Sequence, residues 1–293
     1  MRLLRLVSAA PVLLAAGLFA VAPSSRAQES SNWQKSYPVS GKASLTLTSG
    51  DSSVELHSCN CSEVRIRVDW RDRKASDFNL TEFQSAGHVN FELKEKPHYG
   101  IRVGGHIREP QVFVETPTAL DLEARTSDGA LHVSGVEGRI ELHTSDGAVD
   151  VSDVAGAVRL TASDGSIHLH NVTGTLESRS SDGHATIDGK FTALHVHTSD
   201  GNLDLTLEDG TKLDTSSRVE SSDGRVTLRL PRSLAVDLDV HTSDGGIKCD
   251  LPLTMNGYDS GRESGHNLRG HLNAGGVPLA IHTSDGSVSI EAL

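Results

Sequence analysis

Residues 126–147 read TSDGALHVSGVEGRIELHTSDG, and this stretch holds one complete copy of the unit from which most of the chain is built. The unit begins and ends with Thr-Ser-Asp-Gly, and the two Asp residues lie 18 positions apart. Apolar and polar residues alternate after the turn sequence, as in Leu131-His132-Val133. Such alternation is typical of a β-strand with one buried face.

Ser-Asp-Gly occurs eight times, and the successive intervals are 18, 18, 18, 18, 23, 21 and 41 residues. Four equal intervals in succession indicate a structural repeat. The last interval is close to two units of about twenty residues, which suggests a degenerate or expanded unit. The residues that we expect to form the turns are Asp128, Gly129, Asp146, Gly147, Asp164, Gly165, Asp182, Gly183, Asp200, Gly201, Asp223, Gly224, Asp244, Gly245, Asp285 and Gly286.

Each unit also contains a second apolar pair, such as Ile140 and Leu142, and a glycine such as Gly138 between the two pairs. One unit therefore reads as strand, Gly turn, strand and Asp-Gly turn, and we call it a rung. A single rung cannot bury its own apolar face, so rungs must stack. The sequence predicts an all-β fold, a parallel β-solenoid with two-strand rungs of about 18 residues. An antiparallel sandwich is the alternative, although hairpins have no reason to repeat one turn at this spacing.

The residue types of the Ser-Asp-Gly turn have a direct structural interpretation. Glycine adopts a positive φ without steric cost, and an Asp side chain accepts hydrogen bonds from nearby backbone N–H groups. Ser and Thr hydroxyls can bond from one rung to the next. The alternative is a ladder of calcium sites, but calcium-binding solenoids have more glycine and a different spacing of acids. We expect no cofactor, with calcium as the alternative.

The first 27 residues resemble a secretory signal peptide. Arg2 and Arg5 form a basic start, Val12 to Val21 is apolar, and Ser25-Arg26-Ala27 offers a cleavage site before Gln28. An uncleaved membrane anchor is the alternative, but the apolar stretch is short for a spanning helix. We therefore expect export to the periplasm, the cell surface or the medium.

The net charge of the chain argues against some classes of binding partner. The whole chain has a formal net charge of −12, and removing the three arginines of residues 1–27 makes it −15. Such a protein repels phosphate backbones and anionic lipid, so we expect neither nucleic acid nor a membrane surface as a partner. Cys59 and Cys61 flank one residue, and the sequence leaves open whether they form a disulfide; Cys249 occupies an apolar strand position.

Three stretches place a proline before an alternating strand that ends in Ser-Asp-Gly: Val112–Gly129, Arg229–Gly245 and Gly270–Gly286. Together with the repeated Thr-Ser-Asp-Gly, they resemble a bacterial β-strand-repeat family labelled "putative adhesin", a domain of unknown function. The resemblance covers roughly residues 40–293. It implies a fold and an exported location, but it brings no catalytic or binding residue, and Cys59-Asn60-Cys61 is not part of its pattern.

The predicted organisation is a signal peptide at 1–27, an irregular β-rich part or cap at 28–120, and solenoid repeats at 121–293. An inserted loop near 252–276 interrupts the repeats. Insertions in repeat proteins project from one face and often bind partners, so this loop is a candidate interaction site, and a disordered or decorative loop is the alternative. Its candidate residues are Tyr258, Arg262, His266 and Arg269. The first part holds eight aromatic residues, which we expect to cover the end of the stack: Trp33, Tyr37, Trp70, Phe78, Phe83, Phe91, Tyr99 and Phe113.

An enzyme acting on polysaccharide must be considered, because β-helices include such enzymes. An active site has to break the symmetry of a repeat, and the acids here are equivalent from rung to rung. Histidines such as His143 and His197 stand in the same outward row but three rungs apart, and His241 is expected to follow Glu220 in that row. We predict no catalytic and no metal-binding residues. The predicted function is an envelope or extracellular interaction protein with an unidentified protein or glycan partner; the alternatives are a polysaccharide enzyme and a scaffold that associates end to end.

Overall fold

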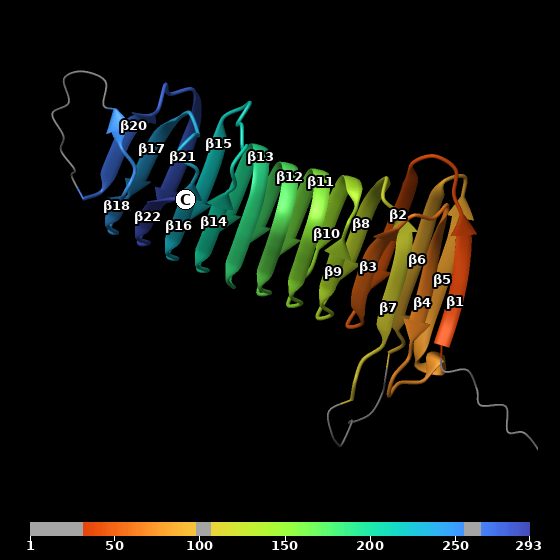
Figure 1. Cartoon of the computed structure of the whole chain (residues 1–293). Helices are drawn as coiled ribbons and strands as arrows, with labels where there is room; N and C mark the ends of the chain where they lie inside the picture. The colour runs from red at the N-terminus through yellow and green to blue at the C-terminus, as the bar shows by residue number, and fades with distance from the viewer. Residues whose placement is uncertain (1–31, 98–106, 255–264) are drawn as a thin grey trace, which may run out of the picture. The chain divides into compact units, whose positions relative to one another are not determined.

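The computed structural model describes residues 32–97, 107–254 and 265–293, and in these residues the chain is almost entirely β-strand (Figure 1). Within these ranges the one helical element is a short 3₁₀ turn, Ala75–Asp77. Most strand pairs are parallel, so the prediction of an all-β fold with a large parallel sheet is confirmed. The proposed signal peptide lies outside the described residues.

The strands form two faces that enclose one apolar core. Neighbours on the first face are, in order, β1 (Asn32–Pro38), β4 (Glu63–Asp69), β7 (Gln111–Pro117), β3 (Ser53–Cys59), β9 (Leu131–Ser134), the first halves of β11 (Val149–Ala162), β12 (Ile167–Ser180) and β13 (Ala185–Thr198), β14 (Leu203–Leu207), β16 (Val226–Leu230), β22 (Val288–Ala292) and β18 (Ile247–Cys249). Those on the second face are β5 (Phe78–Ser85), β6 (His88–Glu95), β2 (Ala43–Ser49), β8 (Leu120–Thr126), β10 (Glu137–His143), the second halves of β11, β12 and β13, β15 (Ser217–Ser221), β21 (Val277–Thr283), β17 (Val236–Thr242), β20 (Asn267–Leu272) and β19 (Leu253–Thr254).

The apolar alternation accounts for the core. Val149 and Val151 pair with Ile167 and Leu169 on the next strand, 18 residues later, and all four side chains are buried. The residues between them point outward and are polar. Because equivalent apolar residues stack from rung to rung, each rung extends the core of its neighbour.

Close backbone packing, rather than a positive φ, explains the glycine of the Ser-Asp-Gly turn. Of the eight turn glycines, Gly183 alone has a positive φ, so that part of the sequence interpretation is wrong. A Cβ on Gly165 would lie 2.0 Å from the carbonyl oxygen of Gly147 in the rung before, and a Cβ on Gly147 would lie 2.3 Å from that of Gly129. Any larger residue would push neighbouring rungs apart. Positive φ occurs at the other turn, where Gly156 has a φ of 126°.

Backbone hydrogen bonds connect these turns. The N–H groups of Ser145 and Asp146 donate to the carbonyl oxygen of Ser127, at 3.2 and 3.0 Å, and those of Ser163 and Asp164 donate to Ser145 in the same way. Thr144 adds a hydroxyl bond to the Ser127 carbonyl at 3.2 Å, as expected of hydroxyls between rungs. Backbone hydrogen bonds therefore connect neighbouring rungs along the edge that the Ser-Asp-Gly turns form.

The stacking order departs from the sequence order at both ends. Rungs follow one another as β6–β7, β2–β3, β8–β9, β10–β11, β11–β12, β12–β13, β13–β14, β15–β16, β21–β22 and β17–β18. The first rung of the chain, β2–β3, is thus enclosed by two later ones, and the last rung is enclosed by two earlier ones (Figure 1). Regular stacking also reaches across the boundary suggested at residue 120, because β2–β3 pairs directly with β8–β9.

Antiparallel strands lie at the two ends of the stack. At one end β1, β4 and β5 are antiparallel to their neighbours, and Trp33 packs against Phe91 with ring centroids 5.6 Å apart. Burial and a hydrogen bond to Glu82 raise the pKa of Tyr37 there. At the other end, β19 and β20 are antiparallel strands within the segment predicted as an inserted loop. Cys59 and Cys61 form a disulfide, and Cys249 is a half-buried free thiol.

Candidate functional site

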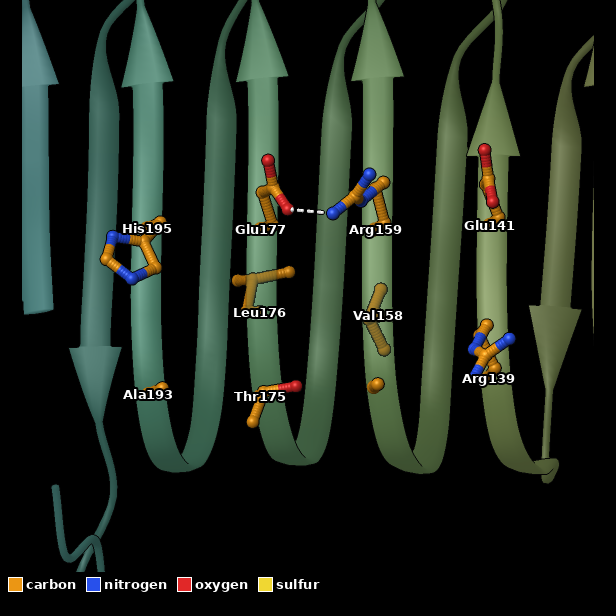
Figure 2. A pocket seen from close by; sticks show the side chains of 10 residues that line it. Arg139, Glu141, Val158, Arg159, Thr175, Leu176, Glu177, Ala193 and His195 are labelled. Atoms are coloured by element: carbon orange, nitrogen blue, oxygen red, sulfur yellow. Dashed lines mark ion pairs between the residues drawn. The ribbon is translucent and has the colours of Figure 1, made fainter. Parts of the chain in front are cut away.

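The outward side chains of the second face form rows that run across the strands. In one row Glu141 on β10, Arg159 on β11, Glu177 on β12 and His195 on β13 occupy equivalent positions. The strand alternation that buries Val158 and Leu176 turns these charged residues outward (Figure 2). Acidic and basic groups therefore alternate from rung to rung.

A shallow groove of about 420 Å³ lies beside this row. Its lining residues are Arg139, Glu141, Ala157, Val158, Arg159, Thr175, Leu176, Glu177, Ala193 and His195. The small side chains of Ala157, Thr175 and Ala193 lie in a neighbouring row. Figure 2 shows two of them, Thr175 and Ala193, beneath the charged row. Because small residues follow one another on three adjacent strands, the surface is hollowed across the strands rather than along one of them.

A second hollow adjoins the first and shares Glu177 and His195 with it. It is lined by Glu177, Ser178, Arg179, His195, Val196, His197, Arg218 and Glu220. The two together cross the second face from β10 to β15. We call this surface the second-face groove.

Ion pairs hold the charged groups of this groove. Arg159 lies 2.6 Å from a carboxylate oxygen of Glu177, and Arg179 binds the other oxygen of the same carboxylate (Figure 2 draws the first pair). Arg179, with help from Arg159, lowers the pKa of Glu177, and Arg218 does the same for the pKa of Glu220. These carboxylates are ionised at neutral pH, which suits them to binding charged groups rather than to donating a proton. Exposed pairs of this kind contribute at most about 1 kcal/mol, so a ligand can replace one partner at small cost.

The turn aspartates form a different surface. All eight are exposed and lie in successive turns along one edge of the stack. Where the chain is described, no three His, Cys, Asp or Glu side chains converge as a metal site would require. The turns that carry these residues are linked from rung to rung by backbone hydrogen bonds to Ser carbonyl oxygens.

Two of the four predicted interaction residues, His266 and Arg269, lie among the described residues. Tyr258 and Arg262 lie outside the described residues. His266 precedes β20, and its Nδ1 lies 3.0 Å from the Gly245 carbonyl oxygen. Arg269 belongs to β20 rather than to a loop, and its Nε lies 2.8 Å from Asp239.

Stacking order also changes the histidine row. His282, and not His241, follows Glu220, because the last rung of the chain lies between them. The rings of His241 and His282 pack edge to face with centroids 6.2 Å apart. The expectation that His241 would be next to Glu220 is therefore wrong.

Sequence reasoning missed the groove. Arg139, Arg159 and Arg179 occupy outward positions of this groove, and they were not singled out from the sequence. The available signal was the small residue two positions before an outward charge on successive rungs, as in Ala157 with Arg159 and Ala193 with His195.

None of the helices in the described part is long and apolar enough to span a bilayer. Among curated proteins, none matches this sequence. A solved structure from Parabacteroides distasonis, described as a "putative lipid binding protein", is similar over 89% of this chain and 97% of its own, with 11% identity and a TM-score of 0.51. A "putative adhesin" from Parabacteroides merdae is similar over the same shares, with 14% identity and a TM-score of 0.48.

The sequence itself matches a described domain family over residues 39–291, which is nearly the whole chain after the first 38 residues. This span includes all ten stacked rungs and both sets of antiparallel end strands except β1. The chain therefore belongs to the Toastrack DUF4097 family.

Proposed function

We propose that this protein is an exported, non-enzymatic β-solenoid, with about 18 residues per rung, that works as an envelope or extracellular interaction protein. Its partner is a protein or glycan that lies along the second-face groove. Membership of the family, the apolar start of the chain and its Ser-Arg-Ala sequence support this proposal. We expect the intact mass of the exported protein to correspond to a mature chain that begins at Gln28.

The single observation that carries the binding role is the groove across β10 to β15. A groove that crosses successive rungs presents charged groups at a repeat of about 4.8 Å, and an extended polymer can contact several of them at once. The ion pairs of Glu177 and Glu220 are exposed, so exchange with charged groups of a polymer costs little.

Filling the groove tests this role. Tyrosine at Ala157 and Ala193 would occupy the floor, while the aromatic side chain remains compatible with a strand. We expect the double variant A157Y/A193Y to lose binding to an array of envelope glycans and extracellular proteins at least tenfold, with an unchanged melting temperature.

Ser152→Tyr is the matched control, since Ser152 points outward from the same strand, β11, on the first face. Equal binding by the groove variant and the control would contradict the assignment of the groove. Turnover in a screen of acidic and neutral polysaccharides would contradict the non-enzymatic assignment instead.

A further inference from the structure

A separate hollow on the first face breaks the symmetry of the repeat. It lies where β7 is flanked by β4 and β3, and its lining residues are Gln34, Glu55, His57, Arg65, Arg67, Phe113, Val114 and Glu115. We call it the β7 hollow. In the outward row that crosses this face, Glu55, His132 and Asp150 occupy successive strands, and β7 places Phe113 there. An outward aromatic side chain in a row of polar residues is not needed for the core.

Arg67 packs on that aromatic ring. Its guanidinium carbon lies 4.0 Å from the ring centroid of Phe113, its partner across the β4–β7 pair. Stacking on the ring holds the cation in place without neutralising it. The position of the positive charge is therefore fixed before any ligand binds.

The carboxylates near Arg67 are bonded to other side chains. Glu115 lies 2.7 Å from Arg65, and the two carboxylate oxygens of Glu55 are bonded to His57 at 2.8 Å and to Gln111 at 2.9 Å. In the part of the chain that the structure describes, Arg67 makes no ion pair. Its fork of N–H donors remains free for an added carboxylate.

From these contacts we propose that the β7 hollow binds a uronic acid residue of a glycan. Arg67 binds the sugar carboxylate, and the part of Phe113 that Arg67 leaves exposed packs against the apolar face of the ring. Gln34, Glu55 and Glu115 offer hydrogen-bond donors and acceptors for hydroxyl groups. The two glutamates accept hydrogen bonds from hydroxyl groups, which a sugar offers and a run of aspartates in a peptide does not, so this set of groups favours an acidic sugar over an acidic peptide.

A titration of the full mature chain with a trimer of galacturonic acid tests the proposal, with the neutral galactose trimer as the comparison ligand. Calorimetry should show binding of the acidic trimer and at least tenfold weaker binding of the neutral one. Arg67→Gln and Phe113→Leu should each weaken binding of the acidic trimer about tenfold or more. Arg67→Lys should have a smaller effect, because lysine keeps the positive charge but lacks the paired N–H donors of the guanidinium. Arg229→Gln is the matched control: Arg229 is an outward arginine of the same face on β16, and its Nε lies 3.2 Å from Glu291. It should leave the affinity unchanged.

Chemical-shift changes in the unaltered protein supply a measurement that does not depend on the variants folding. The Phe113 ring and the Arg67 guanidinium should shift on addition of the acidic trimer, with no comparable change around Arg229. The proposal is overturned by no binding, by equal binding of the neutral trimer, by an equal loss in Arg229→Gln, or by tighter binding of a tri-aspartate peptide. Because the second-face groove lies on the other face, A157Y/A193Y should not alter this binding, and each proposal can fail without the other.

Discussion

At the scale of single residues, close approach of peptide groups determines the identity of the turn glycine. The backbones of neighbouring rungs meet at the Ser-Asp-Gly turn with no room for a side chain, as the 2.0 Å from a Gly165 Cβ to the Gly147 oxygen shows. Gly246, in the same kind of turn, has open space around its Cβ position. Two adjacent glycines, Gly245 and Gly246, therefore have different requirements within one turn.

Gly165→Val should lower the free energy of unfolding by roughly 1–3 kcal/mol, because the side chain must displace the backbone of the preceding rung. Urea denaturation followed by circular dichroism measures this loss. Gly246→Ala is the control and should stay within about 0.5 kcal/mol of the parent protein. A neutral Gly165→Val would show that the rungs do not pack as closely as described.

The titration of His170 provides a second test at this scale. Its Nδ1 lies 2.9 Å from Asp188, which raises the pKa of His170, and Asp153 and Glu208 act in the same direction. The folded state therefore favours the protonated ring, and the protonated His170 stabilises the fold. This stabilisation is complete below the unfolded pKa of about 6.5 and disappears as the pH rises through the folded pKa. NMR should show a lower pKa of His170 in Asp188→Asn, and an identical titration in the variant would contradict the pairing.

At the scale of the elements, the last rung lies inside the stack. β20 pairs with one edge of β17 and β21 pairs with the other edge, so the connection between them crosses the start of β17. Asn273 in this connection donates to the carbonyl oxygens of Arg232 and Leu234, at 2.9 and 2.6 Å. These bonds tie the connection between β20 and β21 to the segment that precedes β17.

Hydrogen exchange should report this enclosure. β22 has a strand on each side, β16 and β18, although it is the last strand of the chain. We expect its amides to exchange as slowly as those of β16 and more slowly than those of β18, whose one partner among the described strands is β22. Fast exchange over Val288–Ala292 would mean that the final rung frays from the stack.

At the scale of the whole molecule, like charge accumulates along one edge while peptide hydrogen bonds hold that edge together. The chain has a net charge of −12, and its turn aspartates follow one another on successive rungs. The bonds that link the turns run from backbone N–H groups to the Ser carbonyl oxygens. Cation binding by the carboxylates is therefore not required to connect the rungs.

This arrangement predicts the effect of calcium on stability. At matched ionic strength, the melting temperature should be nearly the same in millimolar calcium and in chelator. Screening by any salt should instead raise it slightly, because it weakens the repulsion between exposed carboxylates. A large rise specific to calcium would follow the linkage between binding and stability and would make calcium a ligand of the edge.

The sequence by itself determined the strand class, the repeat and the positions of the turns. These follow from local features: alternation places Val149 and Val151 on one side of a strand, and the steric demand at Gly165 recurs with every rung. The expected positive φ was wrong, but the predicted position of the turn was right. Glycine is required there by the close contact with the backbone of the preceding rung instead.

Only the tertiary structure decided which rung stacks on which at the two ends, and with that the β7 hollow. Neighbouring rungs present nearly the same edge to one another, so the sequence contains no local signal that places β21–β22 before β17–β18 or β6–β7 before β2–β3. The pairing of Arg67 with Phe113 depends in the same way on an antiparallel contact between distant segments. Equivalent edges allow many stacking orders. The connections and the end strands differ from rung to rung, and they therefore select one of these orders.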